Sequence, residues 1–236
     1  MLTYHQTVIT SAGWTRRLAA RARLLAYVMA APACLSAQSI GDVEARNAAT
    51  ARVRYEGRDA VQLIAPAAAV TGESYARVGN VMLQDGVIEV EVAGRPSRDA
   101  GPGARGFIGL AFRLADGAYE HFYIRPTNGR APDQIRRNHA TQYAAHPDYG
   151  FERLRRESPE QYESYVDLEP GVWTKLRIEV SGRTARLFVH GATQPALIVN
   201  DLKHEPRVGG VALWVGPGTE GYFANLRVTP AAAPRR

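Results

Sequence analysis

The sequence predicts an all-β fold, a sandwich or barrel of antiparallel strands, and three observations carry this prediction. From residue 51 onward, short alternating runs rich in Val, Ile, Leu, Phe and Tyr are separated by Gly, Pro, Asn and Asp, a pattern typical of strands and turns. Helical periodicity is nearly absent from this part of the chain. The length of 236 residues suits one large all-β domain.

The expected strands follow one another closely along the chain, at a spacing that favours a sandwich or barrel over an α/β arrangement. They lie near 51–55, 60–64, 77–83, 86–92, 106–113, 119–125, 140–143, 163–167, 173–180, 184–189, 196–200, 208–215 and 222–228. Turn signals at Asp85-Gly86, Asp116-Gly117 and Ser181-Gly182-Arg183 indicate antiparallel connections.

Two long segments interrupt the strands. Residues 95–105 form a Gly/Pro-rich loop, and residues 128–162 form an insertion that is either functional or disordered. No repeat or linker divides the body, so one domain is expected over 51–230. A short extension at 38–50 and a disordered tail at 231–236 flank it.

The charge of the protein is concentrated at its N-terminus. The formal net charge is +6 and the pI is about 9.7, values that would ordinarily suggest nucleic acid as a partner. Residues 1–37 hold four arginines and no acidic residue, which leaves 25 basic and 23 acidic groups in the rest. This balance gives no electrostatic footprint for a phosphate backbone, and nucleic-acid binding is set aside. Apolar residues at 45% and charged residues at 22% exclude a disordered or collagen-like chain.

Residues 1–37 have the pattern of an export signal. After the arginines, an apolar run over 24–37 has the length of a signal-peptide core, and small residues at Ala33 and Ala37 suit cleavage. The run is too short to span a bilayer, so a secreted or periplasmic protein without a membrane span is expected. A disordered extension is the alternative, as is a start codon assigned too far upstream, because the first 15 residues form a long polar stretch ahead of the arginines.

Cys34 is the only cysteine, so cleavage after Ala37 would leave neither a disulfide nor a thiolate site. A second possibility is a lipid anchor at Cys34, although Ala31 stands where such signals usually carry leucine. Arg16-Arg17 matches a twin-arginine signal only poorly.

The densest group of candidate functional residues lies in the run 119–130. Strand alternation places Tyr119, His121, Tyr123 and Arg125 on one face, and Glu120 on the inward face or at its margin. Aromatic rings stack on sugar rings and arginine binds pairs of hydroxyls, so this row suits a carbohydrate. Simple cross-strand packing is the alternative. Pro126 ends the strand, which would leave Arg125 at the rim of a ligand surface.

The insertion supplies further candidates, including His139, Gln142 and Tyr143. His139 and His146, with Asp148 nearby, form at best a weak metal pattern, because no tight ligand motif is present. No Gly-x-Ser-x-Gly, Walker or dinucleotide motif occurs, and no metal or cofactor is expected.

A pair of carboxylates on another strand could also perform acid–base chemistry. Glu89 and Glu91 are two residues apart in the run 87–92 and therefore share a face. A solvated outer face of an antiparallel strand is the commoner explanation. Trp173 and Trp214 each lie in an apolar run and are expected to belong to the core rather than to contact a ligand.

An ordered set of segments resembles the concanavalin A-like lectin and glucanase superfamily over about residues 50–230. The segments are 106–113, 119–126, 142–143, 169–180, 209–216 and 222–226. The nearest relatives resemble laminin-G-like and 3-keto-disaccharide hydrolase-like domains of exported bacterial proteins. The resemblance implies a two-sheet antiparallel jelly-roll sandwich that binds or cleaves glycans on a concave face. It also implies that Glu120, Tyr123, Arg125 and Gln142 occupy the recurring polar positions of the family.

Three functions remain open from the sequence. The first is an exported carbohydrate-binding protein whose ligand contacts Tyr123, Arg125, His139, Gln142 and Tyr143. The second is a glycoside hydrolase or lyase in which Glu120 and His121 act as catalytic groups; the glucanase motif Glu-x-Asp-x-x-Glu is absent. The third is an adhesion or structural domain with a protein partner.

Overall fold

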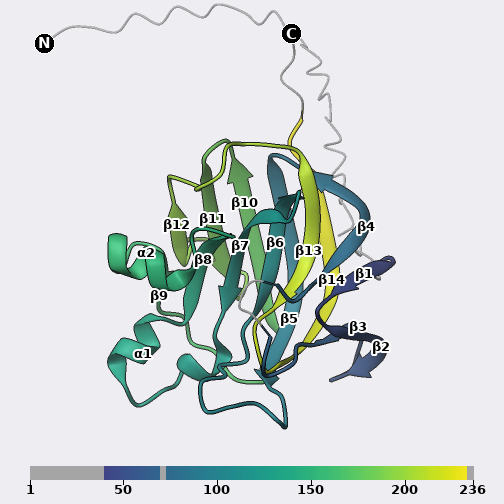
Figure 1. Cartoon of the computed structure of the whole chain (residues 1–236), viewed down its shortest axis with the longest axis vertical. Helices are drawn as coiled ribbons and strands as arrows, with labels where there is room; N and C mark the ends of the chain where they lie inside the picture. Colours follow the sequence, from purple (N-terminus) through teal and green to yellow (C-terminus); the bar gives the residue numbers. More distant parts are fainter. Residues whose placement is uncertain (1–39, 70–72, 233–236) are drawn as a thin grey trace, which may run out of the picture. The chain divides into compact units, whose positions relative to one another are not determined.

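The protein is a sandwich of two seven-stranded antiparallel sheets, as the sequence predicts. A computed structural model describes residues 40–69 and 73–232. The expected signal segment and Cys34 lie outside these residues, as does most of the expected C-terminal tail. Figure 1 shows the two sheets as the two layers of the body.

Sheet A carries the residues of the candidate site. Its strands, in spatial order, are β1 (Val43–Arg46), β4 (Tyr75–Leu83), β13 (Gly209–Val215), β6 (Ile108–Ala115), β7 (Ala118–Ile124), β8 (Thr141–His146) and β9 (Glu163–Ser164). The neighbouring strands are paired antiparallel.

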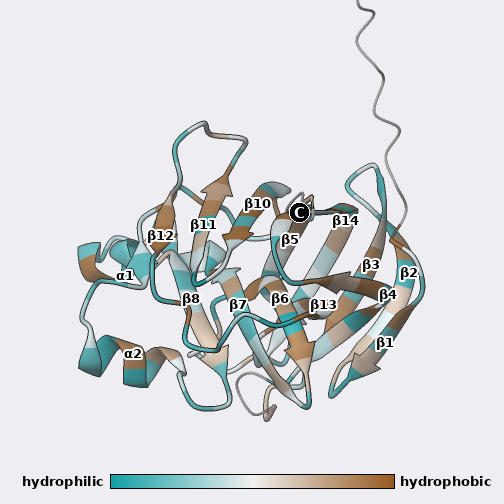
Figure 2. Cartoon of the chain, turned by 90° about the horizontal axis from the view of Figure 1, so that it is seen from above, coloured by the Kyte–Doolittle hydropathy of each residue, from teal (hydrophilic) through white to brown (hydrophobic). Residues whose placement is uncertain are grey.

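Sheet B forms the second layer. Its strands, in spatial order, are β12 (Leu197–Val199), β11 (Thr184–Val189), β10 (Thr174–Ser181), β5 (Gly86–Pro96), β14 (Thr219–Pro230), β3 (Arg58–Ile64) and β2 (Ala49–Tyr55). Figure 2 shows that apolar residues are concentrated in the strands, whereas the connecting turns are mostly hydrophilic.

The core lies between the sheets, and one close approach identifies which side chains point into it. A Cβ built on Gly221 of sheet B would lie 2.8 Å from the side chain of Val215 and 2.9 Å from that of Ile108, both in sheet A. These two residues therefore face sheet B. Because side chains alternate along a strand, Trp214 faces the opposite, outer side of sheet A.

Each expected strand is present, and the turn residues have the backbone that the hairpins require. Asp116 and Gly117, between β6 and β7, both have positive φ values, 52° and 77°. This conformation matches the right-handed twist of the flanking strands. The pairing of β6 with β7 and of β10 with β11 confirms the antiparallel connections expected from the sequence.

Two segments differ from the expectation. The extension at 38–50 contains β1, which pairs with β4, and the first residues of β2. The insertion at 128–162 is structured: it follows a 3₁₀ turn (Pro126–Asn128) and holds α1 (Gln134–Asn138), β8 and α2 (Phe151–Glu157). These elements are too short for periodicity to reveal them. Within the described part, no helix has the length and apolar character needed to cross a membrane.

Candidate functional site

A lateral row of side chains crosses the outer face of sheet A from one edge to the other. The strand registers place Glu163, Gln142, Tyr123, Gly109, Trp214, Tyr75 and Arg46 opposite one another on seven successive strands. The row is polar at both ends and aromatic in the middle. It brings together residues that are as much as 168 positions apart in the chain.

Gly109 shapes the middle of this row. β6 lies between β7 and β13, yet the ring centroids of Tyr123 and Trp214 are only 4.7 Å apart. They can meet because Gly109 has no side chain between them. His121, in the next row, lies 4.8 Å from the Trp214 ring and stacks on Tyr123 at 5.4 Å.

A cavity of about 360 Å³ opens beside this aromatic group. Phe107, Tyr123, Phe151 and Trp214 supply its rings, and loop residues at 67, 101, 103, 104, 217 and 218 complete the described wall. Its volume is within the range of small-ligand pockets, about 300–1,000 Å³. The described lining residues carry no carboxylate. The cavity can therefore stack flat, partly apolar rings.

Arg125 lies behind the aromatic wall rather than at an open rim. Its guanidinium is 5.1 Å from the centroid of Tyr123, 5.7 Å from that of Phe151 and 6.0 Å from that of Phe107. Only 4% of the residue is exposed. Arg125 thus supports the three rings from inside the protein.

The guanidinium of Arg125 is held by four protein groups. Nη1 donates to the His139 carbonyl at 2.9 Å and to Glu163 at 3.1 Å, and Nη2 donates to the Tyr123 hydroxyl at 3.2 Å and to Gln142 at 2.9 Å. A buried charge needs partners of this kind. Burial raises the pKa of Tyr123 and outweighs the opposing effect of Arg125, so Tyr123 is a neutral hydroxyl at neutral pH.

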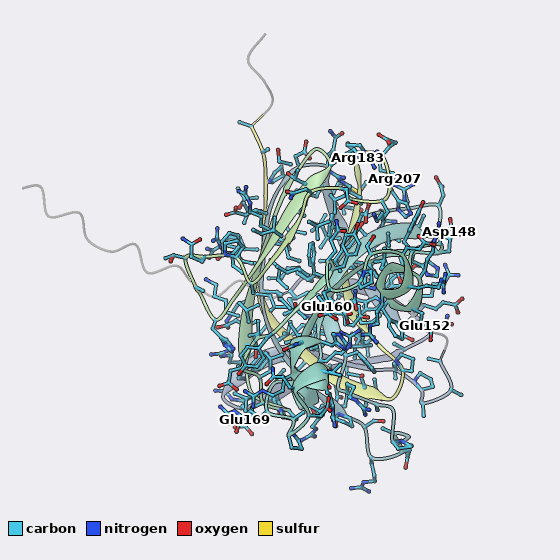
Figure 3. All side chains as sticks on the ribbon, turned by 90° about the vertical axis from the view of Figure 1, so that its left-hand side faces the viewer. Asp148, Glu152, Glu160, Glu169, Arg183 and Arg207 are labelled. Carbon is cyan, nitrogen blue, oxygen red and sulfur yellow. The ribbon has the colours of Figure 1, made fainter. Side chains whose placement is uncertain are left out.

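Glu163 is the carboxylate at the centre of the polar end of the row. Arg155 binds it through two nitrogens, at 2.9 and 2.5 Å, and Arg125 through one. The His139 ring nitrogen Nε2 lies 3.6 Å from Glu163 and 3.3 Å from Glu160. Figure 3 shows Glu160 among the side chains of this edge of the sheet.

Three polar atoms on the outer face of sheet A are buried without a hydrogen-bond partner. They are Tyr119 Oη, His121 Nδ1 and Trp214 Nε1. Buried polar groups are usually paired with protein or water, so these three atoms can pair with a water or a ligand. Burial, and to a lesser degree the nearby His146, lowers the pKa of His121 to about 3. His121 is therefore neutral at pH 7.

The structure brings together part of the predicted site. Tyr123, Arg125, His139 and Gln142 meet around Glu163, and His121 lies against Tyr123 and Trp214. Glu120 and Tyr143 do not join them, because both lie on the core-facing side of sheet A. There, Glu120 accepts hydrogen bonds from the Tyr143 hydroxyl and from the backbone N–H of His204, and none of its surface is exposed.

The other candidate groups are dispersed. Glu89 pairs with Lys175 at 2.9 Å and Glu91 with Arg58 at 3.0 Å on the outer face of sheet B. His139 is in the Glu163 network, whereas His146 stacks on Tyr119. Over residues 40–69 and 73–232, no group of three His, Cys, Asp or Glu side chains could hold a metal ion.

The two tryptophans differ in how they compare with the expectation. Trp214 is fully buried in the main hydrophobic cluster, as expected, and it also lines the cavity. Trp173 is only partly buried and packs with Tyr55 and Tyr222 on the outer face of sheet B, not in the main core. It precedes β10, where alternation no longer fixes its direction.

A second, more polar cavity of about 500 Å³ lies where the row reaches β4 and β1. Tyr75, Arg46 and Arg77 line it together with the β6–β7 turn. Glu44 and Asp116 also line it, so its charges are mixed.

Sequence reasoning missed Phe107, Phe151, Glu163 and the cavity face of Trp214. They become neighbours only through the pairing of β13 with β6 and of β8 with β9, which no local pattern reveals. The one available signal was Gly109, a glycine inside an apolar strand, which often marks a close approach.

Comparison with known proteins gives a fold but no family. No protein-family model matches the sequence, and no curated protein matches it. The structure is similar to the carbohydrate-binding module CBM66 from Bacillus subtilis, with a TM-score of 0.54 and 12% identity over 79% of this chain and 94% of that one.

Two further solved structures are similar at lower TM-scores. The cellulose-induced protein Cip1 aligns with a TM-score of 0.49 and 11% identity, over 84% of this chain and 93% of that one. A Bacillus subtilis protein of unknown function with a galectin-like fold aligns with a TM-score of 0.47 and 11% identity, over 81% and 97%. The likeness to CBM66 shows that the chain has a two-sheet β-sandwich fold.

Proposed function

We propose that this protein binds a glycan in the cavity on the outer face of sheet A. The observation that carries the proposal is the meeting of four aromatic residues, Phe107, Tyr123, Phe151 and Trp214, around one cavity of about 360 Å³. The apolar faces of sugar rings stack on aromatic rings. The fold likeness to a carbohydrate-binding module supports the proposal.

Polar groups in and behind the wall suit the hydroxyls of a sugar. The Trp214 indole N–H and the Tyr119 hydroxyl are buried and unpaired, and such groups gain from a ligand oxygen. The Tyr123 hydroxyl is held in place by Arg125. A few fixed polar groups in an aromatic pocket provide orientation and specificity.

Binding is favoured over catalysis by the chemistry of the lining. Glycoside hydrolysis requires two carboxylates placed across the scissile bond, whereas the described lining has none. Glu163 is engaged by two arginines, and Glu120 faces the core. A His121 pKa of about 3 leaves no protonated imidazole to act as a general acid at neutral pH.

Titration calorimetry against oligosaccharides tests the proposal with a pair of matched variants. Phe151 begins α2 and is only partly buried, so Phe151→Ala removes a cavity ring at small cost to the fold. Tyr165→Ala is the control, because Tyr165 is exposed and outside the described cavity wall. We expect Phe151→Ala to weaken sugar binding about tenfold, the equivalent of about 1.4 kcal/mol, and Tyr165→Ala to leave it unchanged.

Tryptophan fluorescence provides a second readout. A sugar in the cavity should change the emission of Trp214 and leave that of Trp173 unaffected. The change should persist in Trp173→Phe and disappear in Trp214→Phe. Failure of every oligosaccharide tested to bind the wild-type protein would overturn the proposed function.

We also propose that the protein acts outside the cytoplasm, as secreted or periplasmic protein. The proposal rests on the arginine-flanked apolar run within residues 1–37. N-terminal sequencing of protein from the native host should begin near residue 38, or at a lipid-modified Cys34 in the anchored alternative. A native N-terminus at Met1 would contradict export by cleavage.

A further inference from the structure

Two neighbouring arginines make no ion pair within the described residues, and one of them, Arg105, adjoins the wall of the aromatic cavity. Arg105 directly follows Gly103 and Ala104 in the cavity wall, and its Nη1 donates to the carbonyls of Pro102 at 2.6 Å and Ala104 at 3.0 Å. Within the described part of the chain, Arg105 makes no ion pair. Its Nε and Nη2 have no hydrogen-bond partner there.

Arg136 is connected to Arg105 through Thr127. The Thr127 backbone N–H donates to the Arg105 carbonyl at 3.3 Å, and Arg136 Nη2 donates to the Thr127 hydroxyl at 3.0 Å. Arg136 Nε donates to the Asn128 side chain at 2.9 Å. No ion pair forms at Arg136 among residues 40–69 and 73–232, and its Nη1 is free of protein partners there.

Among the described residues no carboxylate pairs with either guanidinium, although the Asp133 carboxylate accepts from the Arg136 backbone N–H at 2.6 Å. Arg125 and Arg155 flank the Phe151 ring, at 5.7 and 5.4 Å, and both already share Glu163. Burial lowers the pKa of Arg105, and the nearby Arg136 and Arg125 lower it further. The side of the cavity near Arg105 therefore has an excess of positive charge in a partly desolvated position.

We infer that the glycan bound in this cavity carries an anionic group, a carboxylate or a sulfate, that pairs with Arg105 and Arg136. The inference rests on the proposed function and names the class of its ligand. Aromatic residues stack on the ring of the sugar, and the free guanidinium N–H groups donate to its charged group. The planar guanidinium matches the geometry of oxyanions.

A purely structural role does not use all of these groups. Arg105 fastens its own loop through Nη1, and Arg136 fastens the turn at Thr127 and Asn128 through Nε and Nη2. Both residues are only partly buried, so the remaining nitrogens face solvent that a ligand can replace. An uncharged hydrogen-bonding side chain would serve the structural contacts without creating mutual repulsion.

An oligosaccharide array with matched members tests the inference. For each sugar backbone it should hold the neutral form, the form oxidised to a uronate and the sulfated form. We expect binding of at least one acidic member to exceed its neutral counterpart about tenfold, as for a hydrogen bond to a charged group. The uronate and sulfate arms show which oxyanion is preferred.

Two variants then test whether Arg105 and Arg136 bind the anionic group of the sugar. Arg105→Gln and Arg136→Gln should each lower the affinity for the acidic member about tenfold, and leave the affinity for the neutral member unchanged. Arg183→Gln is the control: Arg183 pairs with the exposed Glu205 and lies well away from Glu160 in Figure 3. Thermal unfolding checks that each variant is folded.

Salt dependence of the wild-type protein gives a test without substitution. Raising NaCl from about 0.05 to 0.5 M should weaken binding of the acidic member and spare the neutral one, because salt screens partly exposed charges. Binding of neutral sugars without an acidic preference would overturn the inference and retain the proposed function. An acidic preference that survives both substitutions would also overturn it, whereas no binding of any sugar would remove both proposals.

Discussion

The rings of Trp214 and Tyr123 meet at a centroid distance of 4.7 Å across a strand that separates their own strands. The intervening strand contributes Gly109, which pairs with Trp214 on one side and with Tyr123 on the other. The floor of the proposed glycan site is therefore one aromatic surface made from β7 and β13. Its continuity depends on a residue that has no side chain.

Gly109→Ala should damage both the fold and the site. A Cβ at this position would lie 2.6 Å from the Tyr123 Cα and would also meet the Phe122 carbonyl oxygen, both of them backbone atoms that cannot turn aside. We expect a loss of about 1–3 kcal/mol in the free energy of unfolding, typical of overpacking. Urea denaturation measures it, with Gly41→Ala as the control because no atom lies within 4 Å of a Cβ built there. An unchanged midpoint in Gly109→Ala would show that the strands can separate to admit the methyl group.

Much of the fold could be predicted from local patterns. Strand alternation correctly placed Tyr119, His121 and Tyr123 on one face of β7 and Phe122 on the other, because the period of two holds wherever one face is buried. The turns at Asp116-Gly117 and Ser181–Arg183 fixed the hairpins in advance. β1 was not predicted, because its four residues, two of them charged, form too short a pattern.

The site was only partly predictable for the opposite reason. Tyr123 and Arg125 share one strand, so local alternation groups them. Trp214 reaches them through the register of β13 with β6, and Glu163 through that of β9 with β8. A pairing between segments so distant in sequence leaves no periodic trace in either of them. Tyr143 was misplaced for a different, local reason: Gln142 and Tyr143 are adjacent, so strand alternation lets only one of them face the cavity side of β8.

Arg125→Lys should cost stability as well as binding. The sequence suggested an arginine at the rim of a ligand surface. The structure instead shows four hydrogen bonds from a guanidinium that is 4% exposed. A lysine cannot satisfy these acceptors in one plane, so we expect a loss of about 1–3 kcal/mol in unfolding free energy.

The matched control for Arg125→Lys is Arg54→Lys, at an exposed pair with Asp59. Denaturation should show a clear loss of unfolding free energy only for Arg125→Lys. The same variant should bind sugar more weakly, because the Tyr123 hydroxyl loses its partner. Wild-type stability in Arg125→Lys would mean that the buried network tolerates an ammonium group.

Glu120→Gln should weaken the fold and leave the binding of sugar intact. Glu120 is fully buried and accepts from two donors, the Tyr143 hydroxyl and the His204 N–H. An amide presents an NH₂ group to one of these donors, which leaves a buried group unpaired at a cost of about 1–3 kcal/mol. Calorimetry with a sugar and denaturation of the same variant separate the two effects, with the exposed Glu152→Gln as the control. Loss of sugar binding in a fully stable Glu120→Gln would place Glu120 in the functional site after all.

The stability of the protein should fall as the pH is lowered from about 6.5 towards 3, and His121 should account for part of that loss. Burial lowers its pKa from 6.5 to about 3 in the folded state, so between these values the unfolded chain holds a proton that the folded protein does not. The free energy of unfolding therefore rises with pH in this window, by up to about 1.4 kcal/mol per pH unit, and this contribution is complete above pH 6.5. His121→Phe retains a ring against Trp214 and cannot titrate, so its stability should depend less steeply on pH than that of the wild type. His190→Gln, at an exposed histidine, should keep the wild-type slope. Urea unfolding of all three proteins between pH 4 and 8 measures the stability over most of this window and above it. Parallel plots of unfolding free energy against pH for His121→Phe and the wild type would show that His121 is not the group responsible.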